Sequence, residues 1–370
     1  MADLTRSVPP GRNYHRLTVR LTMTLVTAVG ITACRDAAPE IRSPRAQPRG
    51  ASELVERARL SMGSELRLTA WTAAGEKSTV EAFEAVFHEF DRLEALMSVW
   101  KRGSDVERLN AAAGVHPVAV SPEVMEVLED ARQISEWTAG KFDVTFAALS
   151  GLWKFDHDQD NRIPSPRDVA ARLPLVDYRA VELDRAAGSA YLRHKGMRVH
   201  LGGIGKGYAI DRAVTILRAR GLRDFMIQAG GDLYVAGRRG DRPWRVAIRD
   251  PRGPADRSFA SLDLTDGTFS TSGDYERFFI DHGRRYHHIL DPDLGAPARA
   301  SRSATIVATR AVVADGLSTG VFILGGRAGM DLIERLPEVE GVIVTDTNEV
   351  LVSSGLKRRL ILLTPPTDAP

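Results

Sequence analysis

The stretch Val199–Asp211 (VHLGGIGKGYAID) constrains the fold most, because four glycines surround a single lysine directly before a helical pattern. Glycine lets backbone N–H groups approach an anion closely, and the N-terminus of a helix favours negative charge. A helical pattern of apolar residues then continues to Gly221, a typical C-terminal cap. The stretch therefore predicts a strand, a phosphate-binding turn and a helix, with Lys206 as a point charge for the phosphate.

Two standard phosphate-binding motifs do not match this stretch. A P-loop needs Ser or Thr after its lysine, and Gly207 stands there. The dinucleotide fingerprint needs a third glycine where Tyr208 stands. A purely structural glycine turn is therefore an open alternative, and the rest of the chain has to identify the ligand.

The N-terminus carries the pattern of a bacterial export signal. Arginines precede a short apolar run at 21–30, which is too short for a stable membrane span. The only cysteine, Cys34, ends the tetrapeptide ITAC, which resembles the lipobox in which the cysteine becomes the acylated first residue. We predict a lipoprotein of the bacterial cell envelope, anchored to a lipid membrane through acylated Cys34 and facing the periplasm. A plain secretory signal with a coincidental cysteine is the alternative.

These features divide the chain into three parts. We expect a lipoprotein signal peptide at 1–33, the lipidated cysteine with a polar, proline-rich tether at 34–50, and a folded body at 51–370. The net charge of +2 gives no reason to expect a nucleic-acid partner. Small basic clusters at 238–239 and 357–359 are interpreted as solvated surface.

The patterns in the folded body predict an α+β protein with a largely antiparallel central sheet and packed helices. Ser78 with Glu81 indicates a capping box, Ser121–Pro122 begins a second helix, and further helices are expected at 208–219 and 313–324. A basic tail is expected to close the chain. The expected strands are the segments flanking Met62–Ser64, then Tyr191–His200, Phe225–Gln228, Leu233–Ala236, Trp244–Ile248, Phe259–Leu264, Phe278–Ile280, Thr305–Ala308 and Gly341–Val344.

The segment Gly316–Gly320 matches the G-x-S-x-G nucleophile elbow of serine hydrolases. In that fold the histidine follows the serine, but the last histidine here, His288, precedes Ser318. The serine also lies inside a helical pattern rather than at a sharp turn. The sequence therefore argues against a serine hydrolase.

Two other motifs give weak indications of metal sites. The acidic run Asp156–Asp160 suggests a calcium loop, but Asn161 and Arg167 occupy the positions that need Gly and Glu. The pair His287–His288 lacks the additional ligands that a zinc site needs, and its side chains point to opposite faces of a strand. Neither motif is interpreted as a metal centre.

Asp315 and Thr319 are four residues apart in a predicted helix, so they lie one above the other on one face. A carboxylate and a hydroxyl are oxygen ligands of the kind that Mg²⁺ prefers. Spacing alone favours the alternative, in which the helix dipole stabilises Asp315 and Thr319 has no role.

The folded body carries short motifs in a distinctive order. They are Met62–Ser64, Met97–Trp100, Thr138–Thr145, Leu152–Phe155, Leu201–Asp211, Ala229–Asp232, Thr271–Tyr275, His287–Pro292 and Ala314–Thr319. In their order and number they resemble the ApbE family of FAD:protein FMN transferases, over nearly the whole body from Met62 to Gly326. The resemblance implies an α+β fold with a central sheet.

The resemblance also implies an activity. Members of this family transfer the FMN moiety of FAD to a Thr or Ser hydroxyl of a target protein in a Mg²⁺-dependent reaction that releases AMP. The implied partners are FAD, Mg²⁺ and an acceptor flavoprotein. A Mg²⁺-dependent FAD pyrophosphatase and a non-catalytic exported FAD-binding lipoprotein are the alternatives.

Individual residues take roles from the same resemblance. The residues that match FAD contacts are Met62, Trp100, Lys141, Phe142, Asp143, Lys206 and Ile289, and those that match metal ligands are Gly203, through its carbonyl, Asp315 and Thr319. His288 matches the histidine beside the reaction centre, so His288 and Lys206 are the catalytic candidates. His200 stands at a cofactor-binding position where the family usually has Asp, and it cannot act as an always-anionic acceptor.

Overall fold

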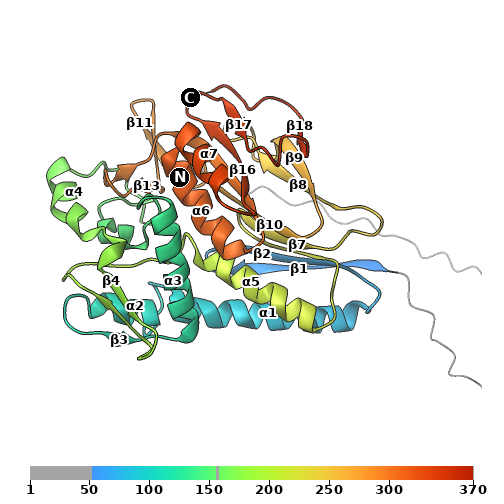
Figure 1. Cartoon of the computed structure of the whole chain (residues 1–370), viewed down its shortest axis with the longest axis horizontal. Coiled ribbons are helices and arrows are strands. Elements are labelled where there is room, and N and C mark those ends of the chain that lie inside the picture. Colours follow the sequence, from blue (N-terminus) through green and yellow to red (C-terminus); the bar gives the residue numbers. More distant parts are fainter. Residues whose placement is uncertain (1–51, 156–157, 370) are drawn as a thin grey trace, which may run out of the picture. The chain divides into compact units, whose positions relative to one another are not determined.

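A computed structural model describes residues 52–155 and 158–369 (Figure 1). The predicted signal peptide, Cys34 and the tether lie outside the described residues. The described residues belong to one compact unit, Arg49–Pro370, which contains all three hydrophobic clusters. That unit therefore has a complete core of its own. None of the described helices combines the length and the apolar character that a membrane span requires.

An antiparallel sheet forms the centre of this unit. Its strand order is β1-β2-β6-β7-β10-β15-β16-β17, and each strand runs antiparallel to its neighbours. This arrangement confirms the predicted fold class. The strands are β1 (Glu53–Ser61), β2 (Ser64–Thr72), β6 (Phe225–Ala229), β7 (Asp232–Ala236), β10 (Gly267–Gly273), β15 (Ser301–Ala308), β16 (Glu340–Thr345) and β17 (Val350–Val352).

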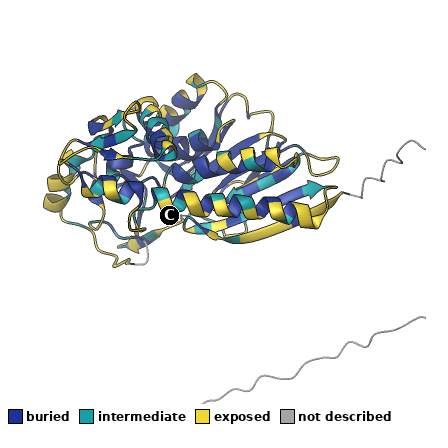
Figure 2. Ribbon diagram, turned by 90° about the horizontal axis from the view of Figure 1, so that it is seen from below, coloured by how far each residue is buried: buried dark blue, intermediate teal, exposed yellow. Residues whose placement is uncertain are grey.

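Helices pack on one face of the sheet, and their inward sides are buried (Figure 2). The aromatic stripe that begins with Phe83 shows why α1 lies there, because its members recur at helical spacing and are all buried. Leu66 of β2 and Ile306 of β15 belong to the same buried cluster. The helices of this layer are α1 (Glu76–Met97), α5 (Gly205–Ala219), α6 (Ala311–Leu324) and α7 (Gly326–Arg335).

A small sheet covers the other face. It consists of β8 (Trp244–Arg249), β9 (Ser258–Leu264) and β18 (Leu360–Leu362), in the order β18-β9-β8. Because successive side chains of a strand point to opposite faces, Tyr234 joins the helix-side cluster and Val235 joins the cluster under the small sheet. The central sheet is therefore buried on both faces.

The remaining elements lie between α1 and α5 in the sequence or form the hairpins after β10. The segment after α1 holds α2 (Asp105–Ala111), β3 (Val118–Ala119), α3 (Pro122–Trp137), η1 (Val144–Leu149), α4 (Pro166–Arg172), η2 (Leu173–Leu175), η3 (Tyr178–Ala180), β4 (Val181–Asp184) and β5 (Ser189–Leu192). The hairpins are β11 (Phe278–Asp281) with β12 (Arg284–His287), and β13 (Leu290–Asp291) with β14 (Ala296–Pro297).

The strand predicted at Tyr191–His200 is wrong beyond Leu192, where β5 ends. Asn110 replaces a neighbouring strand here: its Oδ1 accepts from the N–H of Val199 at 2.7 Å, and its Nδ2 donates to the carbonyl of Val199 at 3.0 Å. The N–H of His200 donates to the carbonyl of Val144 at 2.9 Å. The lead-in to the glycine-rich turn is therefore an irregular segment.

The predicted start of α1 is also wrong. The helix begins at Glu76 after Gly75, and no side chain caps it. Ser78 cannot form the predicted capping box, because its hydroxyl donates to the carbonyls of Ala74 and Gly75 instead. By contrast, α3 begins at Pro122 as predicted, and the Ser121 side chain accepts the N–H of Val124.

Gly341–Val344 is not the last strand, as we had expected. β17 and β18 follow it, and β18 pairs with β9. The prediction treated the end of the chain as a basic tail because the basic residues 357–359 dominate its composition. The buried side chain of Leu356 and the half-buried Leu360 hold this segment against the body.

Candidate active site

Lys206 lies in the first turn of α5 between two buried carboxylates. Its Nζ donates to Asp232 Oδ2 at 2.5 Å and lies 3.7 Å from Asp315 Oδ1. Asp232 is the first residue of β7, and Asp315 lies in the second turn of α6. Three elements that are distant in the sequence therefore meet at one ammonium group. We call Lys206, Asp232, Asp315 and Thr319 the lysine cradle.

Gly207 explains why α5 and α6 approach so closely. A Cβ at this position would lie 2.3 Å from the carbonyl oxygen of Ala311 and 2.8 Å from the Cβ of Asp315. The N–H of Gly207 donates to Asp315 Oδ2 at 2.9 Å. The glycine after the lysine thus serves helix packing and carboxylate positioning, which explains the mismatch with a P-loop.

The charged groups of the lysine cradle shift one another's pKa values. Burial opposes the charge on Lys206, but the carboxylates of Asp232 and Asp315 outweigh it and raise the pKa of the ammonium above its ordinary value. Burial and the nearby carboxylate of Asp232 raise the pKa of Asp315 above its ordinary range, against the effect of Lys206. Lys206 is therefore a permanent cation at neutral pH.

Hydroxyl groups line the cradle. Ser270, directly across the strand pair from Asp232, donates its hydroxyl to Asp232 Oδ1. The Ser272 hydroxyl lies 2.8 Å from Ser318 Oγ and 3.1 Å from Thr319 Oγ1. Ser318 also donates to the carbonyl of Asp315 at 2.8 Å, so the elbow-like serine is a buried helix residue. These contacts fix the orientation of the Thr319 hydroxyl.

The predicted metal ligands come together. A Cβ on Gly203 would lie 3.7 Å from Thr319 Oγ1, so the glycine-rich turn passes directly beside that hydroxyl. The Oδ1 of Asp315 lies too far from Lys206 for a hydrogen bond and can accept a cation. A carboxylate, a hydroxyl and a backbone carbonyl form an oxygen donor set that fits Mg²⁺. The described residues contain no group of three or more His, Cys, Asp or Glu side chains that could hold a metal.

His288 follows the β11–β12 hairpin, and its backbone N–H donates to the carbonyl of Arg277 at 3.1 Å. Its Nδ1 is buried without a hydrogen-bond partner among the described residues. Burial, with the positive charge of Arg277, lowers the pKa of His288 to about 3, so the ring is neutral at pH 7. By contrast, His287 is structural, because its Nε2 donates to the carbonyl of Ala298 at 2.8 Å.

Two predicted FAD contacts are buried and already have partners. Asp143 accepts the N–H and hydroxyl of Thr145 at 2.7 and 2.6 Å and the N–H of Tyr178 at 2.9 Å. Phe142 packs beneath the glycine-rich turn, where a Cβ on Gly203 would lie 3.5 Å from its ring. Both residues shape the site from beneath.

Three more predicted FAD contacts, Met62, Trp100 and Ile289, come from three different segments. The turn that contains Met62 joins β1 to β2, and the carbonyl of Glu65 just beyond it accepts the N–H of Gly230 at 3.1 Å, next to Asp232. Trp100 follows α1, and its side chain is 73% exposed, so its flat ring can stack on a ligand. The side chain of Ile289 is buried in the helix-side cluster.

Lys141 and His200 have partners within the protein. The ammonium of Lys141 lies 2.8 Å from both Asp291 Oδ1 and Asp293 Oδ2. The Nδ1 of His200 accepts the N–H of Gly202 at 3.0 Å. His200 thus uses one ring nitrogen to hold the glycine-rich turn, where the family's usual Asp would offer a carboxylate.

Sequence reasoning missed Asp232, Ser270 and Ser272 as site residues. Asp232 ends the quoted motif Ala229–Asp232, which was a usable signal, but nothing in the spacing connects it with Lys206. Ser270 gave no signal, whereas Ser272 belongs to the stretch Thr271–Tyr275, which the sequence suggests is a hydroxyl-rich turn able to hydrogen-bond phosphate or ribose, or a purely structural turn; the structure places Thr271–Gly273 at the end of strand β10 instead. The pairing of β10 with β7 places Ser270 against Asp232, and the packing of α6 on β10 places Ser272 against Ser318 and Thr319.

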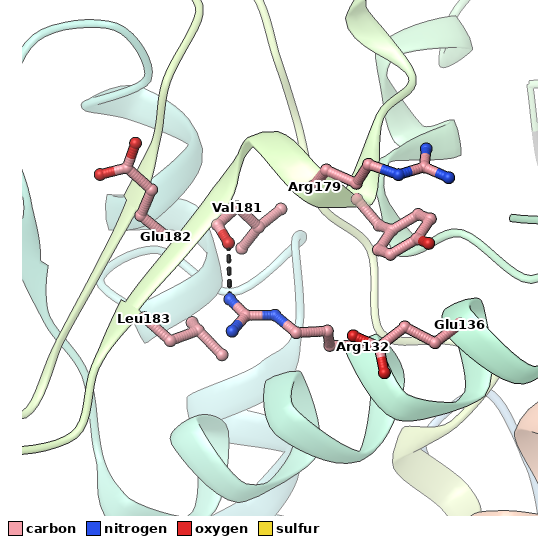
Figure 3. Close-up of a pocket in the computed structure, with 7 residues that line it drawn as sticks. Arg132, Glu136, Arg179, Val181, Glu182 and Leu183 are labelled. Atoms are coloured by element: carbon pink, nitrogen blue, oxygen red, sulfur yellow. Dashed lines mark hydrogen bonds between the residues drawn. The ribbon is translucent and has the colours of Figure 1, made fainter.

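A hollow of about 420 Å³ lies elsewhere, lined by α3, η3 and β4 (Figure 3). Arg132 crosses it and donates to the carbonyl of Val181 at 2.7 Å. Arg179 stacks on the ring of Tyr178 with its guanidinium carbon 4.5 Å from the ring centroid. None of the predicted site residues lines this hollow, so it is not the candidate active site.

Comparison with known proteins gives one consistent result. The model of the ApbE family matches residues 62–343. An FAD:protein FMN transferase of Treponema pallidum is 32% identical over 322 residues, which cover 83% of this chain and 89% of the relative. An FAD:protein FMN transferase of Klebsiella pneumoniae is 32% identical over an alignment that covers 74% of this chain and 85% of the relative.

Solved structures agree with this. The apbe protein of Thermotoga maritima superposes with a TM-score of 0.75 at 31% identity, covering 83% of this chain and 99% of its own. The flavin transferase ApbE of Vibrio cholerae has a TM-score of 0.75 at 25% identity, with the same coverage. The antiparallel sheet with its helix layer is thus the fold of both structures.

Proposed function

Because this chain belongs to the ApbE family and is an FAD:protein FMN transferase, we propose that its lysine cradle binds the pyrophosphate of FAD during flavin transfer. The observation that carries this proposal is the convergence of Lys206, Asp315 and Thr319 beside the glycine-rich turn. A cationic side chain and a flexible backbone turn suit a pyrophosphate, and the oxygen donors suit the cation that accompanies it.

The reaction balances as a displacement at phosphorus. The oxygen of a Thr or Ser hydroxyl of the acceptor protein attacks the phosphorus attached to riboflavin. The bond from that phosphorus to the bridging oxygen breaks, and AMP leaves with the electron pair. Lys206 stabilises the negative charge that grows on the pyrophosphate oxygens, and the turn holds the phosphates in line.

Mg²⁺ would be held by Asp315, Thr319 and the carbonyl of Gly203. When bound, it supplies positive charge at the phosphate oxygens and so makes AMP a better leaving group. The contacts of Ser272 and Ser318 keep the Thr319 hydroxyl in place for this role. The N–H of Gly207 fixes the carboxylate of Asp315 from the other side.

His288 is the proposed acceptor of the hydroxyl proton. Its lowered pKa keeps the ring neutral at pH 7, so a lone pair is available. Part of that lowering comes from the positive charges of Arg277 and Lys206. Binding of an anionic pyrophosphate offsets these charges and raises the basicity of the ring when the substrate is present.

A transfer assay tests the proposed chemistry. The enzyme is incubated with FAD, Mg²⁺ and an acceptor flavoprotein, with the same acceptor carrying Val for its target Thr as the control. Flavin fluorescence that stays on the acceptor band in a denaturing gel, together with released AMP, is the expected result. Free FMN and AMP with an unlabelled acceptor would indicate FAD hydrolysis, and intact bound FAD would indicate a binding protein.

The site of action is a second proposal. The export pattern at 1–33 and the lipobox-like cysteine support a lipoprotein of the bacterial cell envelope, held to a membrane by acylated Cys34 and facing the periplasm. These residues precede the described part of the chain. Exported acceptor flavoproteins would then be the targets of transfer.

A further inference from the structure

Three consecutive apolar residues near the C-terminus are exposed to solvent. The side chains of Ile361, Leu362 and Leu363 are 41, 63 and 52% exposed. Among the described residues they are the only large exposed apolar side chains that are adjacent in the sequence. Neighbours along a strand point to opposite faces, so exposure of all three means that neither face of the strand end is covered. β18 is also the edge strand of its sheet.

Three exposed basic residues precede this run, separated from it by the half-buried Leu360. Lys357, Arg358 and Arg359 have no ion pair within the part of the chain that the structure describes. Many other surface arginines do have such partners, such as Arg245 with Asp263 at 2.8 Å. The charge of Lys357 acts on the carboxylate of Glu334, whereas the charges of Arg358 and Arg359 are available to a partner outside the chain.

The segment presents its side chains from a fixed backbone. The N–H groups of Arg359 and Leu360 both donate to the carbonyl of Leu356 at 2.8 Å, and Leu356 is fully buried. At the other end, the N–H of Leu363 donates to the carbonyl of Phe259 at 2.9 Å. The basic and apolar side chains are thus held next to each other at the small-sheet side of the body, where Figure 1 shows β18 beside β8 and β9.

We propose that Lys357–Arg359 and Ile361–Leu363, here called the C-terminal patch, dock the folded body on an anionic lipid surface. Basic side chains at headgroup level with apolar side chains at the acyl boundary form the pattern that binds such surfaces. The docking does not depend on the proposed chemistry or on acylation of Cys34.

Vesicle binding of the body from residue 35 onward tests this proposal, because that form lacks the export signal and Cys34 and keeps the complete core. Binding to vesicles of phosphatidylglycerol and phosphatidylcholine in equal parts is compared with binding to phosphatidylcholine alone. We expect binding only to the anionic vesicles. Replacing all three basic residues by Gln should weaken it by about fivefold per residue, or on the order of 100-fold in all.

A second variant, Ile361→Ser with Leu363→Ser, should also bind the anionic vesicles more weakly. The binding that remains should still depend on the salt concentration, because the basic residues are intact. The matched controls are Arg238→Gln with Arg239→Gln, and Leu294→Ser, which change an exposed basic pair and an isolated exposed apolar residue. These controls should bind as the parent does. Unchanged thermal unfolding shows that each variant is folded.

The proposal would be overturned by any of three results. Absence of binding to vesicles would leave an acidic protein as the partner of the patch, and equal binding to neutral vesicles would remove the role of the basic residues. Equal loss of binding in the control variants and the patch variants would make the binding a property of the whole surface.

Discussion

The most informative single residue is Lys206, because the protein already surrounds it with opposite charge. Its ammonium has Asp232 at 2.5 Å and Asp315 at 3.7 Å. The sequence predicted Lys206, Asp315 and Thr319 as members of one site, and the structure brings them together. It did not predict Asp232, because a carboxylate at the start of a strand carries no spacing signal toward a helix.

Removing the ammonium should expose the repulsion between the two carboxylates. We expect Lys206→Met to lower the free energy of unfolding by about 3 kcal/mol, and Asp232→Asn in the same chain to restore part of it. Lys141→Met is the control, because Lys141 is equally exposed but pairs partly with the exposed Asp293. Denaturant unfolding measures the parent, the single variants Lys206→Met and Asp232→Asn, the double variant and the control, and strictly additive effects of the two single variants would contradict the account.

Asp315 is the residue on which the metal proposal depends. We expect Asp315→Ala to abolish flavin transfer with little change in thermal unfolding, whereas Asp331→Ala on the exposed surface of α7 should leave transfer unchanged. Chelation should abolish transfer by the parent protein as well. Full activity of Asp315→Ala under chelation would remove Mg²⁺ from the mechanism.

The buried ring of His288 should make stability depend on pH. Its pKa of about 3 in the folded protein lies below its ordinary value of 6.5, so the unfolded chain binds the extra proton in the window between them. Stability should therefore fall as the pH drops from about 6.5 toward 3, by at most about 1.4 kcal/mol per pH unit.

His288→Gln should flatten this dependence, whereas the exposed His116→Gln should not. The same His288 variant should lose roughly 10²–10⁴-fold in transfer rate if the ring accepts the hydroxyl proton. An unchanged slope of stability against pH would show that the ring is not held neutral.

At the scale of elements, the site depends on how closely α5 approaches α6. Helix positions were predictable from apolar periodicity: 208–219 and 313–324 were expected, against observed helices Gly205–Ala219 and Ala311–Leu324. The irregular lead-in at Val199 was not predictable, because Asn110 satisfies that backbone from a helix far away in the sequence. The apolar pattern also could not predict which faces of the helices meet, because tertiary packing decides that.

Gly207→Ala tests the approach of the two helices. The added Cβ would lie 2.3 Å from a backbone carbonyl, so the helices must separate, at a cost of about 1–3 kcal/mol. A displacement of this kind near reacting groups should also reduce the transfer rate by about 100-fold. Gly326→Ala is the matched control, because the nearest atom to its Cβ would be a side-chain carbon at 3.7 Å.

Both effects are read from denaturant unfolding and the transfer assay. The control should unfold and transfer like the parent. Equal behaviour of Gly207→Ala and Gly326→Ala would contradict a tight α5–α6 contact.

For the whole molecule, two contacts with a membrane are proposed. The export pattern and Cys34 predict an acyl anchor, and the C-terminal patch adds a contact from the folded body. Two contacts with a membrane retain a protein more strongly than either contact alone.

Cys34→Ser should prevent acylation and release much of the protein from membranes in cell fractionation. Release should become complete when the three basic residues of the C-terminal patch are also replaced by Gln. Unchanged fractionation of Cys34→Ser alone and of the combined variant would contradict both membrane contacts.

The most direct test of the central claim is a crystal structure of the protein with FAD and Mg²⁺. The account predicts that the pyrophosphate contacts the Nζ of Lys206 and lies beside Asp315, Thr319 and the turn at Gly203. A pyrophosphate bound elsewhere, for example in the hollow lined by Arg132 and Arg179, with Lys206 still paired to Asp232 and out of reach, would contradict it.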